Sequence, residues 1–199
     1  TTMLTANGKL DREVERRQGR NISDACLAND VEHLVLSTIP YFGDGPPLVP
    51  YIRSKLDIEE YVTGKGVPYT FLGPGSFMDE IGGEYLPVKK GVLTGQADND
   101  VKIPYVACRN IGEFARLAFA KPEAFIGRKL NLIGDFISGE ELARVLGRVS
   151  GGKPFRHKAP PMWLMWIFAR EWITLRRQFE SWGRPPHPEA LLDAVAECR

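Results

Sequence analysis

The sequence has few of the residues and motifs that define several common classes of protein. Its three cysteines, Cys26, Cys108 and Cys198, are far apart and form no Cys-x-x-Cys pair. They indicate neither a zinc site nor a disulfide framework, and they favour a reducing compartment, which we expect to be the cytoplasm. The longest apolar run, 162–169, is much shorter than the roughly 20 residues that cross a bilayer. With no signal-like segment at the N-terminus, we expect no membrane partner.

A net charge of only +1 gives no strong field to attract nucleic acid, so we expect no nucleic-acid partner. The densest basic runs, Arg16-Arg17 and Arg176-Arg177, have the acidic neighbours Glu13, Glu15 and Glu180. They are typical of solvated helix faces. The 43% of hydrophobic residues is enough for a packed core. The length allows one domain, with or without a small addition.

Most catalytic and metal-binding motifs are absent as well. The sequence has no Gly-x-Ser-x-Gly, no Gly-Lys-Ser/Thr loop and no His-Glu-x-x-His, which argues against the common hydrolase and triphosphatase sites. The three histidines, His33, His157 and His187, have no ligand spacing. We therefore predict no metal site, and interpret the histidines as structural or surface residues.

Helical and strand patterns alternate in the first half of the chain. We predict helices over 11–29 and 51–63, and buried strands over 31–36 and 67–72, the second broken by Gly73-Pro74-Gly75. This alternation predicts a parallel sheet covered by helices. The helix residues expected inward are Val14, Ile22, Ala25, Cys26, Ile58 and Val62; those expected outward are Asp57, Glu59 and Glu60.

The second half is less regular and ends in an aromatic segment that contains all four tryptophans. We predict that this aromatic segment is a helix, which serves either as a lid over an apolar substrate or as a packing surface. A capping box formed by Ser138 and Glu141 predicts the start of another helix. The other predictions are a loop-rich stretch over 79–100, strands over 102–107, 129–133 and 155–158, and helices over 111–120, 138–149 and 160–182.

Polar residues follow the first predicted strand, where ligands bind in open parallel sheets. Ser37 and Thr38 end the strand, and Tyr51 and Lys55 lie one turn apart at the start of the next helix. A tyrosine hydroxyl, with a pKa of about 10, becomes a usable acid near neutrality when a cation such as Lys55 favours its phenolate. We predict that Tyr51 protonates a substrate carbonyl that is held by Ser37 or Thr38.

Tyr-x-x-x-Lys alone is a weak signal, because the sequence also contains it at Tyr61 with Lys65 and at Tyr85 with Lys89. Only the pair at Tyr51 opens a helix that follows a strand ending in hydroxyl residues. The alternative is that Tyr51 is simply packed at a helix start and that Lys55 is an exposed helix lysine.

Three segments, VEHLVLST, VPYIRSKLDIEEYV and VPYTFLGPGSFMDE, together resemble the NmrA-like branch of the atypical short-chain dehydrogenases. Further on, VACRNIGEFARLAF and LNLIGDFISGEELARVLGRVSG resemble later segments of that family. The similarity covers roughly residues 18–158. Two departures are Tyr51, where this branch often has another residue, and Asn110, where it more often has Asp.

The resemblance implies a Rossmann-type α/β fold and NADP or NAD as cofactor. It implies that Lys55 contacts the nicotinamide ribose and that the backbone around Pro74, Gly75 and Phe77 borders the nicotinamide. The alternative for Gly73-Pro74-Gly75 is a turn that merely redirects the chain. We expect a partial Rossmann-type parallel sheet in residues 1–135, with an irregular insertion at 79–100. A small, mostly helical substrate or lid region would occupy 136–199.

The glycine-rich loop that holds dinucleotide phosphates, Gly-x-Gly-x-x-Gly, occurs nowhere in the sequence. We therefore expect the isolated chain to expose a sheet edge, to associate, and to bind NADPH poorly.

The leading hypothesis is an NAD(P)H-dependent oxidoreductase acting on a small, apolar carbonyl or quinone-like substrate, or a truncated derivative of one. The alternative is a non-catalytic module that senses NAD(P) or binds a protein partner. Both hypotheses are compatible with association of two copies of the chain.

Overall fold

A computed structural model of the chain describes residues 11–42, 47, 49–95, 97–159 and 170–182. It has the mixed α/β fold with parallel strands that the sequence predicts. The backbone forms two compact units. Of the described residues, one unit comprises those within 11–74 and 109–132, and the other those within 75–108 and 133–182. The predicted division into 1–135 and 136–199 stays a prediction.

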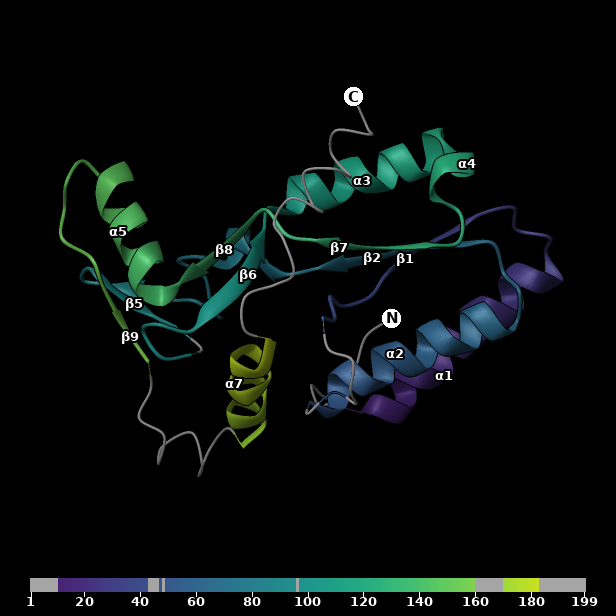
Figure 1. Cartoon of the computed structure of the whole chain (residues 1–199), viewed down its shortest axis with the longest axis horizontal. Coiled ribbons are helices and arrows are strands. Elements are labelled where there is room, and N and C mark those ends of the chain that lie inside the picture. Colours follow the sequence, from purple (N-terminus) through teal and green to yellow (C-terminus); the bar gives the residue numbers. More distant parts are fainter. Residues whose placement is uncertain (1–10, 43–46, 48, 96, 160–169, 183–199) are drawn as a thin grey trace. The chain divides into compact units, whose positions relative to one another are not determined.

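The first unit contains a three-stranded parallel sheet in the order β1-β2-β7. Helices α1 and α2 lie side by side on one face of this sheet, and α3 and α4 lie on the other (Figure 1). This is the layered arrangement that alternating strands and helices produce. The elements are α1 (Arg12–Ala28), β1 (Leu34–Ser37), α2 (Pro50–Gly64), β2 (Tyr69–Pro74), α3 (Cys108–Ala120), α4 (Pro122–Phe125) and β7 (Arg128–Leu132).

Helix α1 begins as expected, and Cys26 packs against the core as predicted, but its most buried positions are others. Asp11 caps it by accepting hydrogen bonds from the N–H groups of Glu13 and Val14. The fully buried positions are Glu15, Gly19 and Ser23, four residues apart, whereas Ala25, which we predicted inward, is exposed. Two small residues and one glutamate therefore form the contact stripe, and at Gly19 the neighbouring helix is too close for a larger residue, since a Cβ there would lie 2.6 Å from Ile58.

Helix α2 places Ile58 and Val62 in the core, as predicted, together with the strand residues Leu36 and Phe71 and with Val67, which precedes β2. The outward prediction is wrong for Glu59, which is buried. Both of its carboxylate oxygens accept hydrogen bonds at 2.8 Å from the Lys129 ammonium group on β7. An acidic side chain on the sheet-facing side of a helix is tolerated when a strand supplies a cation.

Strand β2 does not break at Gly73, contrary to prediction. It continues to Pro74, and both residues stay in register with β7, opposite Asn131 and Leu132. Proline is accepted because it is the last residue of the strand, where a missing N–H disturbs little of the ladder. The glycine is required by close packing, since a Cβ on Gly73 would lie 2.8 Å from the carbonyl oxygen of Ile39.

The second unit contains two small sheets, in the orders β3-β6-β8 and β4-β5-β9. The stretch 79–100, predicted to be rich in loops, contributes two short strands. The capping box of Ser138 and Glu141 is confirmed at the start of α5. The part of the predicted aromatic helix at 160–169 lies outside the described residues. The elements are β3 (Ser76–Phe77), β4 (Val88–Lys89), β5 (Val92–Thr94), β6 (Lys102–Val106), β8 (Asp135–Ser138), α5 (Gly139–Val149), β9 (Arg156–Lys158) and α7 (Arg170–Trp182), with a 3-10 turn at Met78–Glu80.

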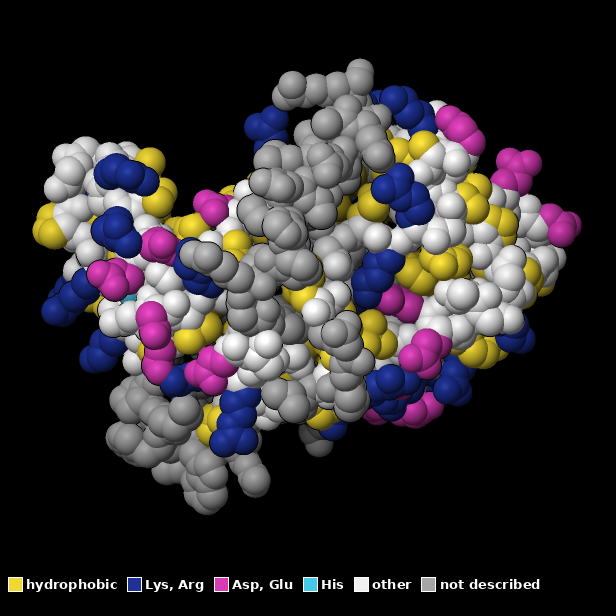
Figure 2. Space-filling model, viewed as in Figure 1, with side chains coloured by type: hydrophobic (Ala, Val, Ile, Leu, Met, Phe, Trp, Pro, Cys, Tyr) yellow, Lys and Arg dark blue, Asp and Glu magenta, His cyan; other side chains and the backbone are white. Residues whose placement is uncertain are grey.

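Basic and acidic side chains are intermixed over the face shown in Figure 2, rather than gathered by sign. Arg16 pairs with Asp57 at 2.7 Å, and Arg176 pairs with Asp98 and Glu180. These ion pairs account for two of the basic residues singled out in the sequence. No helix in the described part of the chain combines the length and the apolar character needed to cross a bilayer.

Candidate functional site

The carboxyl ends of β1, β2 and β7 meet at one edge of the first unit's sheet. Ser37 is in register with Leu72, and the N–H group of Thr38 donates to the Leu72 carbonyl oxygen at 2.7 Å. Pro74 ends β2 one strand away. The sheet thus brings Ser37, Thr38 and Pro74 to the same edge, as their positions after parallel strands predicted.

The segment after β1 passes over this edge. Its backbone packs directly against β2, since the Ile39 carbonyl group lies against Gly73. The side chain of Asn131 on β7 also binds this segment. The Asn131 side-chain oxygen accepts a hydrogen bond from the Tyr41 N–H, and the Asn131 amide donates one to the Tyr41 carbonyl oxygen, both at 3.4 Å. The polar residues at the end of β1 therefore have a fixed backbone.

Ser37 and Thr38 differ in environment. Ser37 is exposed, whereas Thr38 is 8% exposed. Within the described ranges, the buried Oγ1 of Thr38 has no hydrogen-bond partner. A buried hydroxyl without a partner is uncommon and costs stability. Thr38 therefore has unused hydrogen-bonding capacity at the end of a parallel strand, where this kind of fold binds its ligands.

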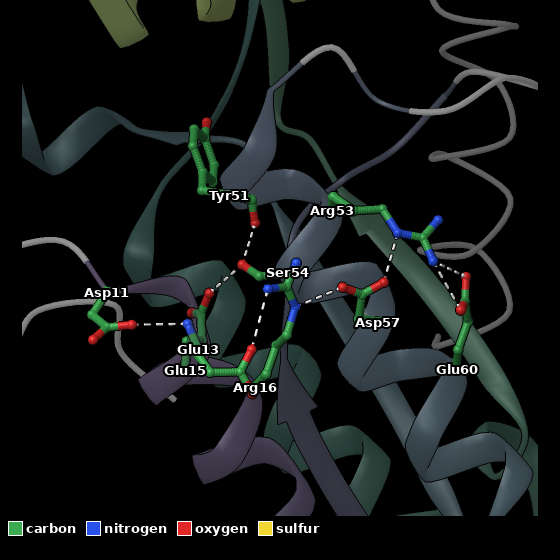
Figure 3. A network of polar contacts seen from close by, with 9 residues as sticks. All are labelled: Asp11, Glu13, Glu15, Arg16, Tyr51, Arg53, Ser54, Asp57 and Glu60. Carbon is green, nitrogen blue, oxygen red and sulfur yellow. Dashed lines mark hydrogen bonds and ion pairs between the residues drawn. The ribbon is translucent and has the colours of Figure 1, made fainter.

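Helix α2 begins at the same end of the unit, after the segment that follows β1. Val49 provides no side-chain cap, and Pro50 occupies the first turn. Tyr51 is half-buried, and in Figure 3 its ring points away from Ser54 and Glu15. Its carbonyl oxygen accepts a hydrogen bond from the Ser54 hydroxyl at 2.8 Å.

Lys55 lies one turn further along α2, and its Nζ forms an ion pair with Oε1 of Glu15 on α1 at 2.8 Å. The side chains are 16% and 1% exposed, respectively. The other carboxylate oxygen of Glu15 accepts a hydrogen bond from Ser54 at 2.6 Å. A carboxylate this deeply buried is tolerated only when it is paired and hydrogen-bonded. Lys55 is therefore not a solvated helix lysine, but one held at a helix interface.

The structure also distinguishes the other two Tyr-x-x-x-Lys pairs. The Tyr61 hydroxyl and the Lys65 ammonium group both contact Asp24 on α1, and this ammonium group lies 5.1 Å from the centre of the Tyr61 ring. These contacts give that pair a role in joining the two helices. Tyr85 is 58% exposed, in a loop of the second unit. The preference for Tyr51 and Lys55 still stands on their position alone, and their chemical roles stay predictions.

Gly75 and Phe77, predicted to border the nicotinamide, belong to the second unit. A Cβ on Gly75 would lie 2.6 Å from the Pro104 carbonyl oxygen, so close backbone packing alone accounts for this glycine. Phe77 is 41% exposed. Beyond it, the carboxylate of Asp79 accepts a hydrogen bond at 2.7 Å from the N–H of Cys108, which holds the Asp79 pKa below its usual value. The roles of Gly75 and Phe77 stay predictions.

Two histidines have structural partners. Nε2 of His33 lies 2.8 Å from the Thr70 hydroxyl, and Nδ1 of His157 lies 2.8 Å from the Asn99 side-chain oxygen. Burial lowers the pKa of both imidazoles. His187 lies outside the described residues. Among the residues that are described, no group of three or more His, Cys, Asp or Glu side chains is arranged to hold a metal ion.

Sequence reasoning missed Glu15, which we interpreted as an acidic neighbour on a solvated helix face. The available signal was its spacing. Glu15, Gly19 and Ser23 recur every four residues, and two small residues at that interval indicate a helix face that a neighbour approaches closely. Extending the face by one turn reaches Glu15.

Comparison with known proteins places these features in a family. The sequence profile of the NmrA-like family matches residues 2–174. Among solved structures, NmrA, a negative transcriptional regulator, is 20% identical with a TM-score of 0.66, over 91% of this chain and 62% of that protein. A triphenylmethane reductase from Citrobacter sp., complexed with NADP(H), is also 20% identical with a TM-score of 0.66, over 94% of this chain and 62% of its own.

A nucleoside-diphosphate-sugar epimerase from Staphylococcus aureus has the same TM-score of 0.66 at 17% identity, over 81% of this chain and 58% of that one. At these identities the likeness shows the fold. The chain thus spans about three fifths of the length of the structures it matches.

Proposed function

The chain belongs to the NmrA-like family, and on that premise we propose that it forms the substrate side of an NAD(P)H-dependent oxidoreductase. The substrate class we propose is a small, apolar carbonyl or quinone-like compound. The triphenylmethane reductase, which was solved with NADP(H), supports a cofactor of this kind.

The observation that carries the proposal is the unpartnered buried hydroxyl of Thr38 at the carboxyl edge of a parallel sheet. In such sheets this edge is where ligands bind. Pro74, the last residue of β2, lies at the same edge, and the α2 residues Tyr51 and Lys55 come between β1 and β2 in the chain. The chemistry of these groups fits a nicotinamide and its ribose, because they offer a hydroxyl, a phenol and an ammonium group.

We assign Lys55 and Pro74 to holding the cofactor. When bound, NAD(P)H supplies a hydride. The Thr38 or Ser37 hydroxyl donates a hydrogen bond to the substrate carbonyl oxygen, and the Tyr51 hydroxyl donates the proton that this oxygen takes up as the carbonyl carbon receives the hydride. The positive charge of Lys55 favours the phenolate that remains.

A second candidate is a module that senses NAD(P) or binds a protein partner without chemistry. It is supported by the likeness to NmrA, a negative transcriptional regulator. The two candidates differ at Tyr51, since a sensor needs the phenol ring but not its acidic hydroxyl.

The test is NADPH oxidation by the whole protein with a panel of apolar ketones and quinones, comparing wild type with Tyr51→Phe. We expect the variant to lose about 10²-fold or more in kcat, the usual contribution of a general acid. Tyr61→Phe is the matched control, because it removes a hydroxyl from the same helix. Equal rates for wild type and Tyr51→Phe would remove Tyr51 from the mechanism, and NADPH binding without oxidation would favour the sensor.

A further inference from the structure

Glu15 is the most deeply buried charged side chain among the described residues, at 1% exposed. It lies on α1, outside the segments that carry the resemblance to the family's site. We propose that Glu15 is a positioning residue, which holds the Lys55 ammonium group in place for the nicotinamide ribose. This inference rests on the proposed function, because it assigns Glu15 a task only through Lys55.

The contacts of the Glu15 carboxylate fix its plane as well as its position. Its two oxygens are engaged separately, Oε2 by the Ser54 hydroxyl at 2.6 Å and Oε1 by Lys55 Nζ at 2.8 Å. The same Ser54 hydroxyl lies 2.8 Å from the Tyr51 carbonyl oxygen. Figure 3 shows the contacts of Ser54 with Glu15 on α1 and with the Tyr51 carbonyl oxygen in the first turn of α2. One carboxylate therefore contacts the first two turns of α2, which carry Tyr51 and Lys55.

Positioning matters because lysine has a long, flexible side chain. A free ammonium group loses rotamer freedom when it binds a ligand, and that loss weakens binding. A lysine already held at a buried carboxylate has lost this freedom before the ligand arrives.

Stability alone is a weak reason for this arrangement. Buried ion pairs are often no more stabilising than apolar residues of the same size. The first unit also offers a comparison in the pair of Glu59 and Lys129, which joins α2 to β7 at 2.8 Å. That pair is similar in chemistry and burial, but neither member has a proposed role at the site.

The experiment measures the affinity of the chain for NADPH by NMR titration at millimolar concentration, alongside thermal unfolding. The variants are Glu15→Gln, Lys55→Met, their double mutant, and Glu59→Gln as the matched control. We expect Glu15→Gln to weaken NADPH binding roughly tenfold, because the variant loses the buried charge that holds the ammonium group. Glu59→Gln should leave the affinity unchanged even if it lowers the melting temperature by the same amount.

The double-mutant cycle decides whether Glu15 acts through Lys55. We expect Glu15→Gln to cause no further loss of affinity once Lys55 is methionine. Two independent, additive losses would overturn the inference, as would a Glu15→Gln chain that binds as tightly as wild type. If Lys55→Met does not change the affinity, or if wild type gives no binding, the proposed function itself fails.

Ser54→Ala provides a milder variant in case Glu15→Gln does not fold. It removes the hydroxyl that orients Oε2 and leaves both charges in place. We expect a loss of about threefold in NADPH affinity, since one neutral hydrogen bond is removed. An unchanged affinity in a folded Ser54→Ala chain would count against positioning by this cluster.

Discussion

Gly19 sets the approach of α1 to α2, and its replacement by alanine should destabilise the protein. In an open helix, Gly→Ala stabilises by about 1 kcal/mol, because glycine has the larger backbone entropy to lose. A Cβ at Gly19, however, would lie 2.6 Å from both Cγ1 and Cγ2 of Ile58, which is 2% exposed. Since Ile58 is β-branched and buried, it has no free rotamer into which to move.

The overlap makes this an overpacking mutation, which costs about 1–3 kcal/mol. Taking the upper half of that range and subtracting the helix-propensity gain, we expect Gly19→Ala to lose about 1–2 kcal/mol of unfolding free energy. For a chain of this length, that lowers the melting temperature by about 2–8 °C.

The matched control is Gly112 on α3, where a Cβ would meet nothing within 4 Å. Gly112→Ala should raise the melting temperature by about 2–4 °C, the effect of propensity alone. Calorimetry of the two variants tests the sign as well as the size. If Gly19→Ala stabilises the chain as much as Gly112→Ala does, the close packing of α1 on α2 is wrong. A further check is Ile58→Ala, in which Gly19→Ala should become harmless.

Three further results are expected. Because burial lowers the pKa of His157, the stability that its neutral imidazole contributes is complete above about pH 6.5 and is lost as the pH falls below that value. Unfolding free energies measured from about pH 8 to pH 5 should show this loss, and His157→Gln should reduce the dependence on pH. Burial and the Asp79 carboxylate raise the pKa of the Cys108 thiol, so Asp79→Asn should speed its alkylation at neutral pH, as read by peptide mass spectrometry; an unchanged rate would exclude the carboxylate as a cause. Ser138→Ala removes the α5 cap and should cost about 1 kcal/mol of unfolding free energy in a denaturant titration, whereas Ser150→Ala, beyond the other end of α5, should cost much less.

The alternation of helices and strands in the first unit was predictable because it rests on local patterns. Apolar periodicity located α1 and α2, and a capping box located the start of α5. Prediction failed where a distant residue decides the outcome. Glu59 looks solvent-facing in sequence, and only the lysine that β7 brings opposite it makes its burial acceptable.

The candidate site shows the same limit. The position of polar residues after parallel strands is a topological rule, so Ser37, Thr38 and Pro74 could be placed at one sheet edge in advance. The partner of Lys55 could not, because Glu15 is 40 residues away in sequence and becomes a neighbour only through helix packing. The unpartnered state of the Thr38 hydroxyl is likewise a property of the folded chain.

The central claim is that this chain supplies the nicotinamide side of an NAD(P)H site. The most direct measurement is saturation transfer from the chain to NADPH by NMR, read proton by proton. We predict that the nicotinamide ring and its ribose receive the most saturation and the adenine ring the least, with the nicotinamide signal reduced in Lys55→Met. Stronger saturation of the adenine ring, or no transfer to NADPH, would contradict the account.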